Sequence, residues 1–192
     1  MCRCENMRMC RCVIIIIGFA LISTAAFSQA RSGIGFAIDV NKPFSNNDYS
    51  IGGGSDIHGS IALSDKWALV PAIGLENMKG NGRAIYDGPD NYATRHIDNI
   101  GLIYAGLSGK YFFKNDLFAR AGTMLFIGAG SGDISAGGIG GSFGAGYSLK
   151  ADRHSTFEIS LNTDVVYIEH SPGTIPIVSL KLAYMFNFKG KD

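Results

Sequence analysis

The segment from 177 to 188 alternates between an apolar face and a mostly polar face. The polar parity includes Ser179, Lys181, Ala183 and Asn187. Because successive side chains of a strand point to opposite faces, the pattern predicts a strand with one face in an apolar medium. Its length suits a tilted strand that crosses a bilayer, which takes about 9–11 residues. The apolar parity comprises Val178, Leu180, Leu182, Tyr184, Phe186 and Phe188.

Seven further segments have the composition of strands. Apolar and polar residues alternate clearly in most of them, whereas the faces of 97–113 and 117–127 cannot be assigned from the sequence. An open sheet edge in hydrocarbon would leave backbone groups unpaired, so the sheet must close. We therefore predict an all-β fold, an eight-stranded antiparallel up-and-down transmembrane β-barrel. The seven segments are 33–40, 51–63, 67–76, 97–113, 117–127, 139–149 and 157–165.

The connections between these segments alternate in length. Three are short and polar, at 64–66, 114–116 and 150–155. Short turns on one side and long loops on the other are typical of outer-membrane barrels. Aromatic residues next to the short turns predict an interfacial girdle on that side. The long connections are 41–50, 79–96, 128–138 and 168–176, and the girdle residues are Trp67, Phe113, Phe118, Tyr147, Phe157, Phe186 and Phe188.

The N-terminal stretch has the layout of a secretory signal peptide. Three arginines precede the apolar run 13–22, and small residues follow it. The run is too short to span a membrane as a helix. We predict a cleavable signal at 1–30 and a barrel domain at 31–192, with cleavage after Ala30 and a rival cut after Ser28. The signal sequence would export the chain to the cell outer membrane.

All four cysteines precede this apolar run, at Cys2, Cys4, Cys10 and Cys12. Their Cys-x-Cys spacing invites a metal interpretation, but these residues would leave with the signal peptide. We therefore expect no disulfide, no metal site and no cofactor in the mature chain.

The charge balance argues against nucleic acid as a partner. The chain has 17 Lys and Arg against 16 Asp and Glu, and removal of residues 1–30 leaves 14 against 15. Neither a basic patch nor a basic run is apparent in the mature part.

Charged residues of both signs fall on the parity expected to face the barrel interior. In a narrow barrel such charges need partners, so we expect a structural network of ion pairs. A proton or ion path is the alternative. The predicted interior network comprises Asp39, Asp56, His58, Glu76, Lys110, Arg120, Glu158, Asp164 and Lys181.

The C-terminal segment of the chain resembles a known assembly signal. The segment 181–188 is similar to the C-terminal assembly signal of bacterial outer-membrane barrels, with Lys181, Ala183, Phe186 and Phe188 in its slots. Ala183 stands where glycine is usual, and four residues follow the final Phe. This resemblance implies the barrel assembly machinery as a partner.

The mature chain as a whole resembles the outer membrane protein β-barrel domain family, the small PorT-like barrels. Similarity is carried by 104–122, which includes Lys110-Tyr111-Phe112 and Arg120-Ala121-Gly122, and by the strand at 67–75. The proline that many members carry early in the fourth strand is missing. The resemblance implies a fold and a location, but no single activity.

From these observations we expect a monomeric, porin-like protein of a Gram-negative envelope. It would contact outer-membrane lipid and have a structural role or bind an extracellular ligand through its long loops. Aromatic residues and Arg carry much binding energy in interfaces, which makes the loop residues of these types the binding candidates. These are Tyr49, Arg83, Tyr86, Tyr92, Arg95 and His96.

Two alternatives belong to other classes of protein. A lipid-modifying enzyme would need a Ser and a His together, for which His58 with Ser60, His154 with Ser155 and His170 with Ser171 are candidates. None of these pairs resembles the motif of a known lipid A enzyme closely, so we expect a protein that is not an enzyme. A soluble periplasmic barrel that binds an apolar ligand would instead have an apolar interior.

Overall fold

Eight strands form the wall of the barrel in the computed structural model. The structure describes residues 32–44, 49–86, 92–96, 99–113, 116–130, 135–152, 154–167 and 174–188. The predicted signal peptide lies outside these residues and stays a prediction. The wall strands are β1 (Gly33–Pro43), β2 (Gly52–Ala62), β3 (Trp67–Met78), β6 (Ile100–Phe112), β7 (Leu117–Gly130), β8 (Ser135–Lys150), β9 (Ser155–Tyr167) and β10 (Thr174–Asn187).

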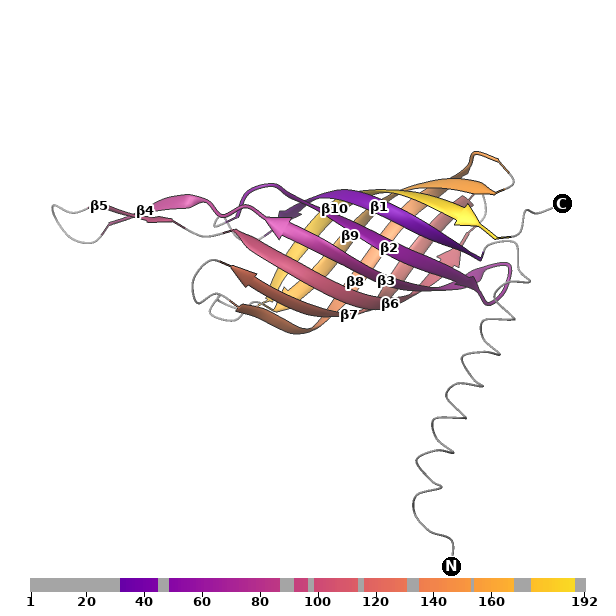
Figure 1. Ribbon diagram of the computed structural model, residues 1–192, viewed down its shortest axis with the longest axis horizontal. Coiled ribbons are helices and arrows are strands. Elements are labelled where there is room, and N and C mark those ends of the chain that lie inside the picture. The colour runs from indigo at the N-terminus through magenta and orange to yellow at the C-terminus, as the bar shows by residue number, and fades with distance from the viewer. Residues whose placement is uncertain are drawn as a thin grey trace, which may run out of the picture.

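The sheet closes through the first and last of these strands. β1 pairs with β10 from Gly33 opposite Asn187 to Pro43 opposite Ile177, and every neighbouring pair is antiparallel. The order around the barrel is β1-β10-β9-β8-β7-β6-β3-β2. Figure 1 shows the strands tilted around a single closed cylinder. The predicted eight-stranded antiparallel barrel is therefore confirmed.

The outer wall of the barrel is apolar and its inner wall carries most of the polar residues. On β1, Ile34, Phe36, Ile38 and Val40 are 51–58% exposed, while their neighbours on the other parity are buried. The same alternation holds on β9 and β10, as the sequence predicts. A protein that folds in water has the opposite arrangement, so the outer wall is that of a barrel surrounded by lipid.

Strands β6 and β7 have large apolar residues on both faces. Leu102 and Tyr104 are buried inside the barrel, whereas Ile103 and Leu107 point outward. On β7 the same holds for Phe126 inside the barrel and Leu125 outside it. This apolar part of the interior explains why the faces of 97–113 and 117–127 could not be read from the alternation of hydrophobicity.

Two long connections differ from the prediction. Most of 128–138 belongs to β7 and β8, which stay paired as far as Ala129 opposite Ser135, so this predicted loop is wrong. The connection at 79–96 contains a two-stranded ribbon, β4 (Gly82–Tyr86) and β5 (Tyr92–His96). Figure 1 shows the ribbon beyond one end of the barrel, on the side opposite the short turns.

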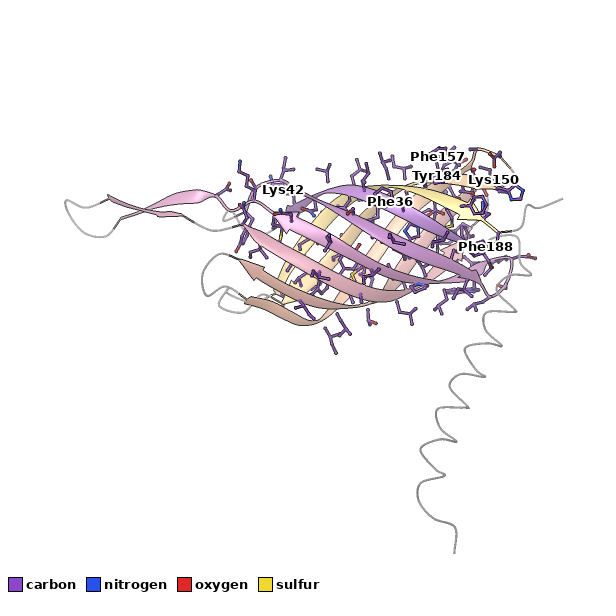
Figure 2. All side chains as sticks on the ribbon, viewed as in Figure 1. Phe36, Lys42, Lys150, Phe157, Tyr184 and Phe188 are labelled. Atoms are coloured by element: carbon purple, nitrogen blue, oxygen red, sulfur yellow. The ribbon has the colours of Figure 1, made fainter. Side chains whose placement is uncertain are left out.

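The aromatic girdle forms at the end with the short turns. Trp67, Tyr111 and Phe113 pack in series, with both ring-centroid distances at 4.9 Å. In Figure 2, Phe157, Tyr184 and Phe188 gather at this same end. Phe118 is the exception, because it is 4% exposed and points into the barrel, so its assignment to the girdle is wrong.

Candidate functional site: the barrel interior

Asp56 is the centre of a network of polar side chains inside the barrel. Its carboxylate accepts a hydrogen bond from Lys181 Nζ at 2.6 Å and one from the Tyr104 hydroxyl at 3.0 Å, and His58 Nδ1 lies 2.6 Å away. Lys181 Nζ also lies 3.8 Å from Asp39 Oδ2. The register explains this, because Asp39 is opposite Lys181 on β10 and Asp56 is opposite Ala37 on β1. With Tyr104 on β6, four strands are thus tied together across the interior.

A second group of charges lies nearer the short turns. Lys110 Nζ is 2.5 Å from Glu158 Oε1 and 3.8 Å from the centre of the Phe118 ring. Arg120 is directly opposite Lys110 in the sheet, and two like charges in such positions repel each other. Arg120 Nη2 instead donates to Asn162 Oδ1 at 3.0 Å. Each cation therefore has its own partner.

The remaining predicted acids are Glu76 and Asp164, and both are buried. In the described part of the chain, Glu76 Oε2 and Asp164 Oδ1 have no hydrogen-bond partner. The structure thus places all nine predicted network residues inside the barrel or on its inner wall, and it connects seven of them by ion pairs or hydrogen bonds. Tyr104 joins the network although the sequence did not point to it, and Asn162 joins it from the polar parity of its strand.

Aromatic rings fill the interior where the charges do not. Glycines of β8 make room for these rings, because a Cβ at Gly140 would collide with Phe126 and one at Gly146 would collide with Phe118. Between the two groups of charges lies a cavity of about 20 Å³, bordered by His58, Lys110 and Lys181 among others. This is the room of about one water molecule. Over the residues that the structure describes, side chains fill the interior.

The described Ser and His candidates do not form a catalytic pair. His58 Nδ1 contacts Asp56 in the interior. His154 Nδ1 lies 3.3 Å from the backbone oxygen of Asn187, and Ser155 Oγ is hydrogen-bonded to the Tyr184 hydroxyl at 2.9 Å. The third pair, His170 with Ser171, lies outside the described residues.

The turn that contains His154 is held by a carboxylate. The backbone N–H of His154 donates to Asp152 Oδ1 at 2.7 Å. This hydrogen bond stabilises the ionised carboxylate and lowers the pKa of Asp152. The carboxylate of Asp152 therefore has a structural role in this turn.

The predicted binding residues fall into two groups. Tyr49 is 6% exposed and packs in a cluster with Met78 and Ile100. Its side chain is therefore not available at the surface, which corrects its prediction as a binding residue of a loop. The others lie on or at the ends of the β4–β5 ribbon. Only the backbone is described there, and it pairs Arg83 with Arg95 and Tyr86 with Tyr92.

The proposed assembly segment occupies both faces of β10. Lys181 and Ala183 are buried inside the barrel. Phe186 and Phe188 lie on the outer wall, where their ring centroids are 6.5 Å apart. The backbone N–H of Phe188 donates to the carbonyl of Ser32 at 2.8 Å, which closes the barrel at the very end of the strand.

Neither a metal-binding cluster nor a membrane-spanning helix is present in the described ranges of the chain. Within these ranges, His, Cys, Asp and Glu side chains form no group of three that could hold a metal ion. The same part of the chain contains no helix with the length and hydropathy needed to cross a membrane.

Comparison with known proteins supports the fold. No family model and no curated protein matches the chain. Neisserial surface protein A is similar in structure, with a TM-score of 0.57 at 14% identity over 81% of this chain and 96% of that protein. Weaker similarity is found with Ail, the attachment invasion locus protein of Yersinia pestis, with a TM-score of 0.46 at 10% identity over 81% and 96% of the two chains.

A designed transmembrane β-barrel is also similar, with a TM-score of 0.41 at 12% identity over 82% of this chain and 98% of the design. The fold and the apolar outer wall define the class as small eight-stranded transmembrane barrels. The narrower resemblance to the PorT-like barrels stays an expectation.

Proposed function

We propose that the protein is a non-catalytic, monomeric barrel of the outer membrane that presents its long connections outside the cell. The observation that carries this proposal is the inside-out distribution of side chains, with an apolar outer wall around buried ion pairs. A signal peptide would export the chain, and the segment 181–188 would engage the barrel assembly machinery. Neisserial surface protein A has the same fold, which is consistent with a place at the cell surface.

The packed interior argues against transport as the role of this barrel. Ion conduction needs a continuous aqueous path, but the interior contains paired charges, aromatic rings and a cavity of about 20 Å³. In the described part of the barrel, the interior cavity of about 20 Å³ is far smaller than the pocket that an apolar ligand needs, which argues against a soluble ligand-binding barrel. The parts left for interaction are the outer wall and the connections at the end opposite the short turns.

The β4–β5 ribbon is the part of the connections best placed to bind a partner. It lies beyond the barrel end in Figure 1 and carries five of the six predicted loop residues. The backbone groups of β4 and β5 pair with each other over five residue pairs, from Gly82 opposite His96 to Tyr86 opposite Tyr92. We propose that this ribbon holds the contact surface for an extracellular ligand.

Protease treatment of intact cells tests the orientation of the ribbon. The full chain is expressed in a Gram-negative host, and trypsin is added to cells with a sealed outer membrane. Cleavage is expected after Arg83 and Arg95, with the barrel left intact. Cleavage at these sites only after permeabilisation of the outer membrane would place the ribbon in the periplasm and contradict the proposal.

Binding is tested with a chain in which a Gly-Ser turn replaces 82–96. Cells with the full chain and cells with the shortened chain are compared for adhesion to immobilised extracellular matrix proteins. The replacement should abolish adhesion without lowering the amount of barrel in the outer membrane. Equal adhesion of the two strains would show that the ribbon is not part of the binding surface.

A further inference from the structure

A depression on the outer wall runs from Asp39 on β1 across β2, β3 and β6 to β7, near the long connections. Its volume is about 850 Å³, within the range of ligand pockets. The outward side chains of Leu75, Ile103 and Ile127 border it, and these are 55–73% exposed. Residues of the inward parity also border it, namely Asp39, Gly54, Glu76, Leu102 and Gly128. Because Asp39, Glu76 and Leu102 are buried, the depression is open toward the side that faces lipid.

The register explains why the wall is hollow here. Gly53 on β2, Asn77 on β3 and Gly101 on β6 are consecutive cross-strand partners, and all three line the depression. Neither glycine has a side chain to fill it, and a Cβ at Gly101 would meet nothing within 4 Å. The next row consists of Leu75, Ile103 and Ile127, which are also cross-strand partners. A row of residues without large apolar side chains thus lies beside a row that has them.

Two lysines lie on the side of the depression toward the long connections. Lys79 is two residues beyond Asn77, and Lys42 is two residues beyond Val40, which pairs with Gly53. Both lysines are exposed, and Figure 2 shows Lys42 at this end of the barrel. Among the described residues, neither has an acidic partner. At the other rim, by contrast, Lys150 Nζ lies 4.0 Å from Asp116 Oδ1.

Asn77 gives the depression a polar point between the lysines and the apolar row. Its side chain is exposed on the lipid side and has no hydrogen-bond partner among the described residues. An amide in an apolar medium costs free energy unless it is hydrogen-bonded. An ester or phosphate oxygen of a lipid would accept a hydrogen bond from the Asn77 amide.

We propose that this depression binds a phosphorylated lipid of the outer leaflet. The phosphate would lie against Lys42 and Lys79, the linker region against Asn77, and an acyl chain over Gly53 and Gly101 beside Leu75. This inference rests on the proposed outer-membrane location, and it specifies which lipid the wall selects and where. Lysines near an anionic membrane surface attract it strongly enough for two of them to change affinity by at least about tenfold.

The test uses the mature chain folded in detergent micelles, with lipid A as the probe. Binding is measured by native mass spectrometry, with phosphatidylcholine as the comparison lipid. We expect K42Q/K79Q to lower lipid A affinity at least about tenfold. The matched control K66Q/K150Q removes the same charge at the other rim and should leave the affinity unchanged. An equal loss in the control would mean nonspecific attraction and overturn the site.

Gly101→Leu tests the depression itself, because it fills the space without a change of charge. It should weaken lipid A binding and leave the barrel folded. Unchanged binding would overturn the placement of the acyl chain. Full competition by inorganic phosphate would show a site for free phosphate and overturn the assignment to a lipid.

Folding is followed in the same samples by gel migration before and after boiling. A sample without a heat-sensitive folded form would contradict the proposed membrane barrel. A folded barrel that does not retain lipid A would contradict only the lipid site.

Discussion

Lys181 Nζ lies 2.6 Å from Asp56 Oδ2, although 125 residues separate the two along the chain. The contact joins β10 to β2 across β1, which lies between them. It can form only when the last strand has closed the sheet. The ion pair is therefore a consequence of barrel closure, and its loss should lower the stability of the whole barrel.

Lys181→Met should destabilise the barrel strongly. The substitution would leave Asp56 and Asp39 without their buried cation, and removal of one partner of such a pair costs about 3–5 kcal/mol. Urea unfolding in lipid vesicles measures the free energy. The double variant D56N/K181M should recover part of the loss, because it removes a carboxylate that the single variant leaves unpaired. A single variant as stable as the wild type would show that the network contributes nothing.

Charge should be far more costly on the outer wall than in the interior. Leu161 is 58% exposed on β9, and Leu161→Arg should cost about 2–4 kcal/mol if this position lies near the middle of the bilayer. The neighbouring Asn162→Asp should be milder, because Arg120 already donates to Asn162. The two are compared by refolding titrations into lipid. Equal stability would reverse the assignment of the two faces of β9.

Phe118→Ala should also be severe. The Phe118 ring is buried under Lys110 Nζ at 3.8 Å, and truncation of a buried Phe costs about 3–5 kcal/mol. Phe113→Ala, at the exposed girdle, is the matched control and should cost less. Denaturant unfolding ranks the two variants. The reverse order would return Phe118 to the girdle, where the sequence alone had placed it.

The fold was largely predictable because most strands have one apolar and one polar face. Val40 and Asp39, or Leu161 and Asn162, differ enough to fix the parity of their strands. On β6 and β7 the interior itself includes Leu102, Tyr104 and Phe126, so the contrast between faces is lost. The β4–β5 ribbon has no apolar parity to reveal it, since it does not line the barrel.

The sequence predicted which residues belong to the interior site, but not which of them contact each other. Parity alone placed Asp56 and Lys181 on the inner face. That these two meet, and that Lys110 pairs with Glu158 rather than with another acid, depends on strand order and on the curvature of the wall. Tyr104 was missed because an aromatic residue is read as apolar, although its hydroxyl contacts Asp56.

The last strand should govern assembly. Phe188→Ala should lower the inserted fraction, because it weakens both the signal-like segment and the girdle. Deletion of 189–192 removes only a polar tail and should leave insertion intact. Outer-membrane fractions of the two variants are compared by immunoblot. If the deletion abolished insertion and Phe188→Ala did not, the signal would lie in the last four residues.

The most direct test of the central claim is the behaviour of the natural full chain in fractionated cells. Membranes are separated on a sucrose gradient and washed with carbonate, and the outer-membrane fraction is run on a detergent gel with and without boiling. We predict that the mature protein stays in the outer-membrane fraction and migrates differently before and after boiling, because the closed, ion-paired barrel survives detergent. Recovery in the soluble periplasmic fraction, with identical migration of both samples, would contradict the account.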